Sequence, residues 1–213
     1  MEQPAERQSE RYGSDVSRRS FLSGASATAV GNAMLDGPLV AAKPADAQAA
    51  VLRVVGPEPA LLPLHVNGSI QTLAVAPHMT LAEVLRDLIG LTGTKVACDR
   101  GACSACTVWL DGTPVASCMI LAVDVAGRPI TTIEGLAEGD KLHRVQAAFI
   151  EHDAMQCGFC TPGMVMSCAA LVEHNPHPSS DDVKAAISGH LCRCGAYQKV
   201  VEATLAAVPG RRG

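Results

Sequence analysis

The stretch ACDRGACSACTVWLDG, residues 97–112, places three cysteines in one short loop. Cys98, Cys103 and Cys106 lie among Gly, Ala and Ser residues, and the loop runs directly into the apolar segment TVWL. Cys118 follows in the next segment of the chain. Tight cysteine clusters bind metal more often than they form disulfides, because a disulfide requires two cysteines at a defined Cα separation. The stretch therefore predicts a metal site with four cysteine ligands.

The spacing C-x4-C-x2-C with a more distant fourth cysteine is that of plant-type 2Fe–2S centres. Three thiolates come from one loop and the fourth from the next strand. The small residues Gly101, Ala102, Ser104 and Ala105 let backbone N–H groups approach the sulfurs and tune the reduction potential. A structural zinc site with four thiolates is the alternative, but zinc sites more commonly use two C-x2-C pairs.

A second set of four cysteines lies nearer the C-terminus, in QCGFC and LCRCG. Its members are Cys157, Cys160, Cys192 and Cys194, and each pair precedes a predicted helix. Both pairs can therefore meet at one end of a helical bundle, near helix N-termini that favour negative charge. Spacing alone leaves zinc, 2Fe–2S and a redox dithiol open for this set. The ninth cysteine, Cys168, lies on an apolar helix stripe and is expected in the core.

The composition predicts a globular protein that binds no nucleic acid. The chain has 213 residues, 48% of them apolar, and a formal net charge of −4, whereas nucleic-acid-binding domains usually carry a basic face. No apolar run is long enough to span a membrane. No Gly-rich dinucleotide fingerprint is present either, so neither flavin nor NAD is expected in this chain.

Residues 61–135 predict short strands around one helix. Asn67–Gly68 suits a two-residue hairpin turn, and strands are expected at 107–110, before the turn at Asp111–Gly112, and at 129–133. Thr80 and Glu83 form a capping box for a helix whose apolar positions recur at helical spacing. Those apolar positions are Leu81, Val84, Leu85 and Leu88.

Residues 140–213 predict four helices that bury a common core. Leu142, Val145 and Phe149 mark the first, and Val200, Val201, Thr204, Leu205 and Val208 mark the fourth. We expect Thr161 to cap the second helix, with Pro162 in its first turn and a stripe of Val165, Cys168, Ala169 and Val172. Ser179 is expected to cap the third helix and Gly189 to end it.

The N-terminus predicts a twin-arginine export signal. SRRSFLSG, residues 17–24, contains Arg18 and Arg19 and precedes a weakly apolar stretch that ends at Leu35. A cleavage site of A-x-A type follows at Ala47–Ala49. We therefore expect a signal peptide over 1–49, a linker over 50–60 and export of the folded protein to the periplasm. A tail with two chance arginines is the alternative.

The motifs GTKVACDRGACSACTVWLDG, QCGFCTPGM and GHLCRCGAY, with the spaced Cys118, together resemble the iron–sulfur subunit of the xanthine oxidase family of molybdenum hydroxylases. With the leader, the chain looks most like the small subunit of a periplasmic aldehyde dehydrogenase. The resemblance covers residues 61–208 and implies an α+β fold with two domains. These are a β-grasp 2Fe–2S ferredoxin-like domain over 61–138 and an all-α four-helix-bundle 2Fe–2S-binding domain over 139–213.

The resemblance also implies the roles of particular residues. Cys98, Cys103, Cys106 and Cys118 would bind one 2Fe–2S cluster, and Cys157, Cys160, Cys192 and Cys194 the other. The second cluster would lie next to a molybdopterin that a large catalytic subunit holds, with Gln156 hydrogen-bonded to the pterin and Cys194 as the nearest ligand. Many relatives have Gly at the position of Ser104. If that position needs a positive φ, serine costs about 1 kcal/mol.

We therefore expect an electron-transfer subunit of a molybdenum-dependent aldehyde oxidoreductase, with no catalytic residue of its own. Electrons would leave through an FAD-binding subunit or a cytochrome acceptor. The alternatives are the same role in an isoquinoline- or xanthine-type heterocycle hydroxylase, a free-standing ferredoxin-like carrier and a structural zinc protein. His190 is expected to be an ordinary loop histidine, and Lys95 and Arg100 to be surface charges.

Overall fold

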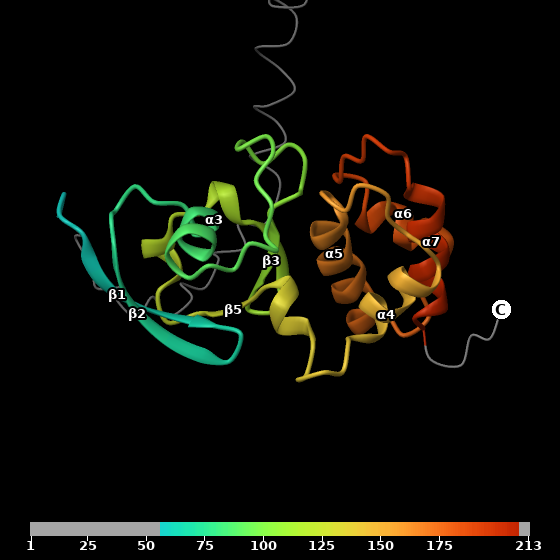
Figure 1. Ribbon diagram of the computed structural model, residues 1–213, viewed down its shortest axis with the longest axis horizontal. Helices are drawn as coiled ribbons and strands as arrows, with labels where there is room; N and C mark the ends of the chain where they lie inside the picture. The colour runs from blue at the N-terminus through green and yellow to red at the C-terminus, as the bar shows by residue number, and fades with distance from the viewer. Residues whose placement is uncertain (1–55, 209–213) are drawn as a thin grey trace, which may run out of the picture. The chain divides into compact units, whose positions relative to one another are not determined.

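The computed structural model describes residues 56–208. The predicted export signal, with Arg18, Arg19 and the cleavage site at Ala47–Ala49, lies outside the described residues. Within the described part, a β-sheet with its covering helical turns comes first in the chain and four helices follow (Figure 1). No helix in this part is long and apolar enough to cross a membrane.

Five strands form one mixed sheet in the order β2-β1-β5-β3-β4. β1 pairs antiparallel with β2 and parallel with β5, and β3 pairs antiparallel with both β4 and β5. This topology, with a helix against one face, is the β-grasp arrangement that the resemblance implies. The strands are β1 (Ala60–Val66), β2 (Ser69–Val75), β3 (Thr107–Leu110), β4 (Thr113–Ala116) and β5 (Pro129–Thr131).

Two short hairpin turns set the register of the sheet. Asn67 and Gly68 join β1 to β2 with φ of 50° and 78°, and Asp111 and Gly112 join β3 to β4 with φ of 51° and 77°. Positive φ at both central residues is the signature of a type I′ turn, whose twist matches that of the flanking strands. Both turns that the sequence predicts are confirmed.

The helix that begins after Thr80 is shorter and less regular than its apolar pattern predicts. The capping box is present, since Thr80 Oγ1 accepts from Glu83 N at 3.2 Å and Glu83 Oε2 accepts from Thr80 N at 2.7 Å. However, α3 (Leu81–Glu83) passes directly into a π-helical turn, η1 (Val84–Leu88). The wider turn moves side chains away from the 3.6-residue period. Leu88 is consequently 43% exposed, and its predicted place on the apolar face is wrong.

The four predicted helices are confirmed as α4 (Arg144–Glu151), α5 (Thr161–His174), α6 (Ser180–Ala186) and α7 (Tyr197–Ala206). They share one core, in which Cys168 is fully buried on the expected stripe of α5. Three 3-10 helices complete the described part: η2 (Ser117–Met119), η3 (Ala122–Val125) and η4 (Ile133–Leu136).

Two predicted helix ends are shifted. Cys160, rather than Thr161, occupies the N-cap of α5, and no side chain caps that end. α6 ends at Ala186, before the expected Gly189, whereas Ser179 caps it as predicted and also forms a capping box with Asp182. The shift at Cys160 matters because it places a cysteine directly at a helix N-terminus.

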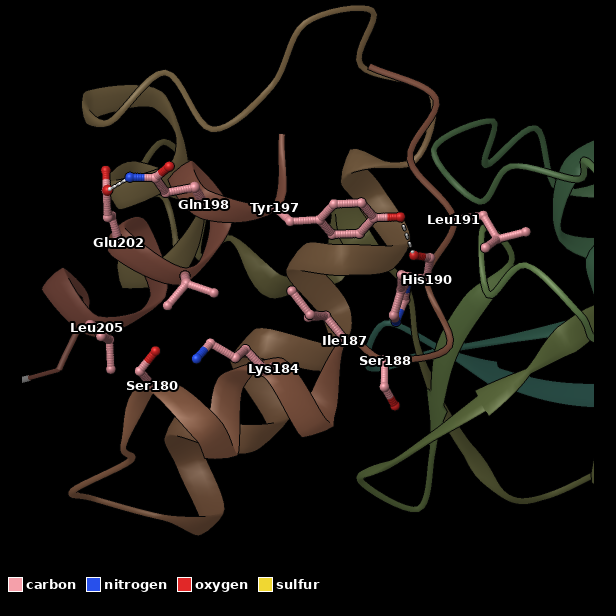
Figure 2. A pocket seen from close by; sticks show the side chains of 11 residues that line it. Ser180, Lys184, Ile187, Ser188, His190, Leu191, Tyr197, Gln198, Glu202 and Leu205 are labelled. Atoms are coloured by element: carbon pink, nitrogen blue, oxygen red, sulfur yellow. Dashed lines mark hydrogen bonds between the residues drawn. The ribbon is translucent and has the colours of Figure 1, made fainter. Parts of the chain in front are cut away.

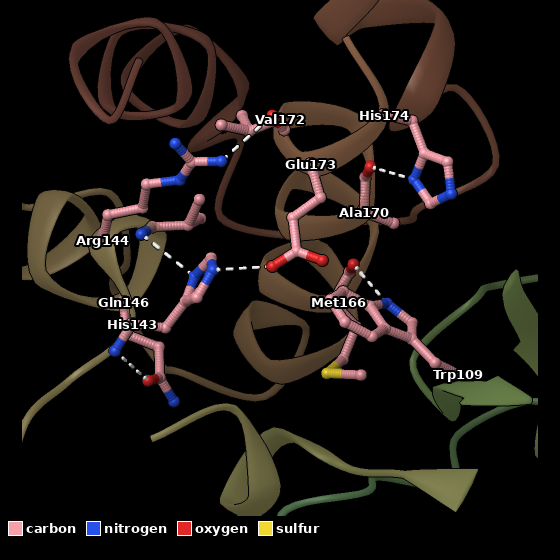
Figure 3. A network of polar contacts seen from close by, with 10 residues as sticks. Trp109, His143, Arg144, Gln146, Met166, Ala170, Val172, Glu173 and His174 are labelled. Carbon is pink, nitrogen blue, oxygen red and sulfur yellow. Dashed lines mark hydrogen bonds and ion pairs between the residues drawn. The ribbon is translucent and has the colours of Figure 1, made fainter. Parts of the chain in front are cut away.

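The sheet and the helices meet where β3 packs against α5. Trp109 of β3 is buried in the helical core, and its Nε1 donates to Met166 O at 2.8 Å (Figure 3). On the other side of α5 in Figure 3, His143 caps α4 and its Nε2 lies 3.2 Å from Glu173 Oε1. The Trp109 contact fixes α5, and with it the loop that precedes it, relative to the sheet, and the His143 contact fixes α4 against α5.

Candidate metal centres

The structure brings the first four cysteines together beside α3. The loop after residue 97 carries Cys98, Cys103 and Cys106, and Cys118 lies in η2, next to the end of β4. The Cys103 thiol donates to Cys98, the Cys118 thiol donates to Cys106, and Cys118 also lies within electrostatic range of Cys98. Ser117 Oγ donates to Cys106 O at 2.7 Å, which holds the fourth cysteine next to the loop.

Left-handed residues turn the backbone amides of this loop toward the sulfurs. φ is 50° at Asp99, 69° at Gly101 and 56° at Ser104, so Ser104 does occupy a position that glycine would favour. Ala102 N donates to Cys98 Sγ at 3.3 Å. Backbone hydrogen bonds, chiefly from Arg100, lower the pKa of Cys98 to about 7.

The sulfur of Cys118 has a different environment. Burial raises the pKa of Cys118 to about 11, although the backbone N–H of Gly101 donates to it. Amide donors favour a thiolate and burial opposes it, so this site suits sulfurs whose charge a metal neutralises. The first site therefore fits a group that four thiolates bind.

Side chains from other parts of the chain hydrogen-bond to the backbone of residues 92–94, which lead into the first cysteine loop. These contacts were not predicted from the sequence. Arg86 Nη1 donates to Thr94 O at 2.7 Å and to Thr92 O at 3.2 Å, and Gly93 N donates to Glu134 Oε1 at 2.8 Å. A Cβ on Gly93 would lie 2.3 Å from the Ile133 side chain. Gly93, the glycine of the GTK motif, was the one sequence feature that could have indicated close packing here. Arg86 and Glu134 lie outside the cysteine motifs, so their spacing gave no indication.

The second four cysteines lie on the two loops that precede α5 and α7. The Cys160 thiol donates to Cys192, and Cys157 is within electrostatic range of Cys160. Burial raises the pKa of Cys160 to about 12. Burial also acts to raise the pKa of Cys192, but the N–H of Ala196, the thiol of Cys160 and the N–H groups of Cys194 and Gly195 outweigh it, so that pKa is lowered.

Both helix N-termini thus lie at the second site, as the sequence predicts. Among residues 56–208, no three His, Cys, Asp or Glu side chains surround a position for a single metal ion. A 2Fe–2S cluster requires a wider set, because its four thiolates are divided between two irons. The contacts of the first site join all four cysteines, and those of the second join Cys157, Cys160 and Cys192, with Cys194 two residues after Cys192 in the same loop. Both sets fit such a cluster.

Gln156, the expected pterin contact, is exposed directly before Cys157. It borders a hollow of about 350 Å³ that Met155, Gly195 and Ala196 also line. The hollow therefore places Gln156 beside the turn that contains Cys194.

Three charged or titratable residues near the sites are placed as follows. His190 lies in a loop as predicted, but it is only 4% exposed and its Nε2 lies 2.8 Å from Ser167 Oγ. Lys95 Nζ donates to Thr92 O at 2.7 Å, and the exposed Arg100 donates from Nε to Cys98 O at 3.1 Å. Both cations brace the first loop through its carbonyls.

One backbone hydrogen bond joins the two cysteine sets. Leu191 N donates to Cys103 O at 3.2 Å. Cys103 belongs to the first set, and Leu191 directly precedes Cys192 of the second. The two sites are therefore neighbours within one chain, although their cysteines are far apart in sequence.

Known proteins share both halves of this arrangement. Residues 64–129 match the family described as 2Fe-2S iron-sulfur cluster binding domain, and residues 132–205 match the [2Fe-2S] binding domain family. The chain is 49% identical over 150 residues to the nicotine 6-hydroxylase small subunit of Paenarthrobacter nicotinovorans, covering 70% of this chain and 90% of that one. It is 40% identical over 172 residues to the aldehyde oxidoreductase iron-sulfur-binding subunit of Escherichia coli strain K12, covering 73% and 75%.

A solved structure agrees. Quinoline 2-oxidoreductase from Pseudomonas putida 86 superposes with a TM-score of 0.69 at 42% identity, covering 71% of this chain and 94% of the matched chain. The fold and the two sites thus define a protein with two 2Fe–2S-binding domains. The chain belongs to the iron–sulfur subunits of the xanthine oxidase family of molybdenum hydroxylases, and it is an electron-transfer component of such an oxidoreductase.

Proposed function

We propose that this chain carries electrons from a molybdopterin centre in a large catalytic subunit to an external acceptor, within a complex that oxidises aldehydes. The observation that carries the proposal is the Leu191 N to Cys103 O hydrogen bond of 3.2 Å, which makes the two cysteine sites neighbours. When bound, a 2Fe–2S cluster accepts and releases one electron. Two adjacent sites that each carry one electron suit stepwise electron transfer better than storage of electrons at one site.

The eight cysteines of the two sets are the proposed ligands. Cys103, Cys106 and Cys118 are buried, so the first site keeps water away from most of its sulfurs. Cys157 is exposed, and Cys160, Cys192 and Cys194 are half-buried. The more open second site therefore suits the end of the relay that faces the large subunit.

Two features support contact of the second site with that subunit. Gln156 offers both an N–H donor and a carbonyl acceptor, which suits the mixed polar edge of a pterin. Phe159 and Leu191, each next to a cysteine of this set, are 47% and 62% exposed. Contiguous exposed apolar patches are typical of surfaces that a partner covers, and we propose that these two side chains form part of one.

The first site is the proposed exit. Met119, directly after Cys118, is 61% exposed, and Leu121 is 40% exposed. An apolar surface beside the buried sulfurs suits the docking of an FAD-binding subunit or a cytochrome acceptor. The proposed order is therefore large subunit, second site, first site, acceptor.

A heterocycle is the second candidate substrate class. The identity of 49% to a nicotine 6-hydroxylase small subunit exceeds the 40% to the aldehyde oxidoreductase subunit. Aldehyde oxidation remains the first proposal because the predicted twin-arginine leader accords with a periplasmic aldehyde dehydrogenase. We also propose, from that leader, that the complex is exported in folded form.

Purification of the native complex tests the function. The expected result is co-purification of a large molybdenum-containing subunit from the periplasmic fraction, with bleaching of the iron–sulfur absorbance when an aldehyde is added. Bleaching by an N-heterocycle alone would select the second candidate. An iron-loaded chain that purifies without any partner would instead support a free-standing carrier.

Gln156→Ala tests the proposed pterin contact. It should lower the rate at which substrate reduces the second cluster while leaving the iron content unchanged. Gln71→Ala, which removes the same amide from strand β2, is the matched control and should leave that rate unchanged. Equal effects of the two substitutions would contradict the role of Gln156.

A further inference from the structure

The hydroxyl of Tyr197 bridges two backbone groups of the segment that contains Cys192. Tyr197 is the first residue of α7, and its side chain reaches back to His190 (Figure 2). Cys192 N donates to Tyr197 Oη at 2.8 Å, and the same hydroxyl donates to His190 O at 3.0 Å. One hydroxyl therefore satisfies both a donor and an acceptor of the cysteine loop.

Three further hydrogen bonds tie the segment to other elements. His190 N donates to Ile187 O at 2.9 Å at the end of α6, and His190 Nε2 lies 2.8 Å from Ser167 Oγ on α5. Leu191 N donates to Cys103 O of the first cysteine loop at 3.2 Å. These three contacts fix residues 190 and 191, whereas the Tyr197 hydroxyl accepts from the backbone N–H of Cys192 itself, whose carbonyl accepts from Gly195 N at 3.4 Å.

The turn immediately before Tyr197 supplies amide donors to the Cys192 sulfur. The backbone N–H groups of Ala196, Cys194 and Gly195 lower the pKa of Cys192, and Gly195 N donates to Cys192 O at 3.4 Å, which folds this turn against Cys192. Because Tyr197 directly follows these residues, its bond to Cys192 N holds the sulfur and its donors together from both sides. Hydrogen bonds to ligand sulfurs stabilise the reduced, more negative state of an iron–sulfur cluster and so raise its reduction potential.

We propose that Tyr197 is a positioning residue of the second cluster, whose hydroxyl holds Cys192 against the amide donors at the start of α7 and thereby raises the reduction potential of that cluster. The inference rests on the proposed function in one respect, namely that Cys192 is a ligand of the second 2Fe–2S cluster. A higher reduction potential makes the second cluster a better acceptor of electrons from the large subunit.

Removal of the hydroxyl alone separates this role from packing. The Tyr197 ring lies in an apolar groove of about 650 Å³ between α6 and α7, which Ile187, Val201 and Leu205 also line. Tyr197→Phe keeps that ring and removes only the two hydrogen bonds. The fold should therefore survive. Cys192 N and His190 O should hydrogen-bond to water instead, and residues 190–192 should become more mobile.

The test is an EPR-monitored redox titration of the iron-loaded full-length chain. For Tyr197→Phe, we expect the midpoint of the second cluster to move to lower potential, with a roughly threefold smaller ratio of reduced to oxidised cluster at the wild-type midpoint. The midpoint of the first cluster should stay unchanged. Amide hydrogen exchange at residues 191–193 should become faster.

Thr204→Val is the matched control, because it also removes a buried hydroxyl from α7, one that donates to Val200 O at 2.7 Å. It should change neither midpoint. An unchanged or raised midpoint of the second cluster in Tyr197→Phe, or an equal shift of both clusters, would overturn the proposal. A wild-type chain with a single cluster signal would contradict the two-cluster function instead, so the two failures are distinguishable.

Discussion

Gly163 is the point where α5 presses most closely on the first cysteine loop. A Cβ at this position would lie 2.4 Å from Ser104 O and 3.2 Å from Ala105 O. A carbon and a carbonyl oxygen normally stay about 3.3 Å or more apart. Because the oxygens are backbone atoms, they cannot rotate aside. Gly163→Ala therefore requires the helix and the loop to separate by roughly 0.9 Å.

The expected cost follows from two opposing terms. Overpacking of a well-packed contact costs about 1–3 kcal/mol. Replacing glycine by alanine in a helix returns up to about 1 kcal/mol. A 2.4 Å contact with a backbone oxygen places the overpacking cost at about 3 kcal/mol, so the net loss of unfolding free energy should be about 2 kcal/mol. That loss lowers the melting temperature of a chain of this size by about 4–8 °C. The first cluster should also show an altered EPR signal, since its loop contains Ser104.

Thermal unfolding at one fixed scan rate, with EPR spectra of the reduced protein, measures both effects. Gly189→Ala is the matched control, because a Cβ there would lie 3.2 Å from Ser104 Oγ, a side-chain atom that can rotate away. It should melt close to wild type. If Gly163→Ala melts at or above the wild-type temperature with an unchanged EPR signal, the close packing inferred for this contact is refuted.

Three further predictions concern single residues. Ser104→Gly should raise the unfolding free energy by up to about 1 kcal/mol in urea titrations, because φ is 56° there, and a lower midpoint would argue against stored strain. Cys118→Ser should abolish the EPR signal of the first cluster and reduce iron from about four to about two per chain, whereas Cys168→Ala should keep both clusters. Burial raises the pKa of the Cys168 thiol to about 11 from 9.0, so its neutral form stabilises the fold below pH 9 and that stability is lost as the pH rises toward 11. The loss should be on the order of 2 kcal/mol in denaturant titrations and absent in Cys168→Ala; identical pH profiles would count against it.

Local chemistry explains what the sequence could predict. Asn67–Gly68 determines a hairpin because the turn requires positive φ at both residues. The capping boxes at Thr80 and Ser179 likewise depend on residues three apart in sequence. Cysteine spacing indicates a shared centre for the same reason, since one loop must wrap around it.

Features that depend on distant packing could not be predicted in this way. His190 is buried because α5 presents Ser167 to it, and no local pattern signals that contact. Arg86 donates to the backbone at the start of the first loop from the π-helical turn η1. The apolar repeat that includes Leu88 predicts an α-helix and gives no indication of the π-helical geometry. The Tyr197 hydroxyl acts five residues away from Cys192, across a turn whose shape the sequence does not specify.

EPR spectroscopy of the dithionite-reduced full-length chain, with metal analysis of the same sample, tests the central claim most directly. Two distinct 2Fe–2S clusters in one chain should give two different signals, each of about one spin per chain, together with about four irons. A single signal with about two irons, or a colourless protein that contains zinc, would contradict the claim.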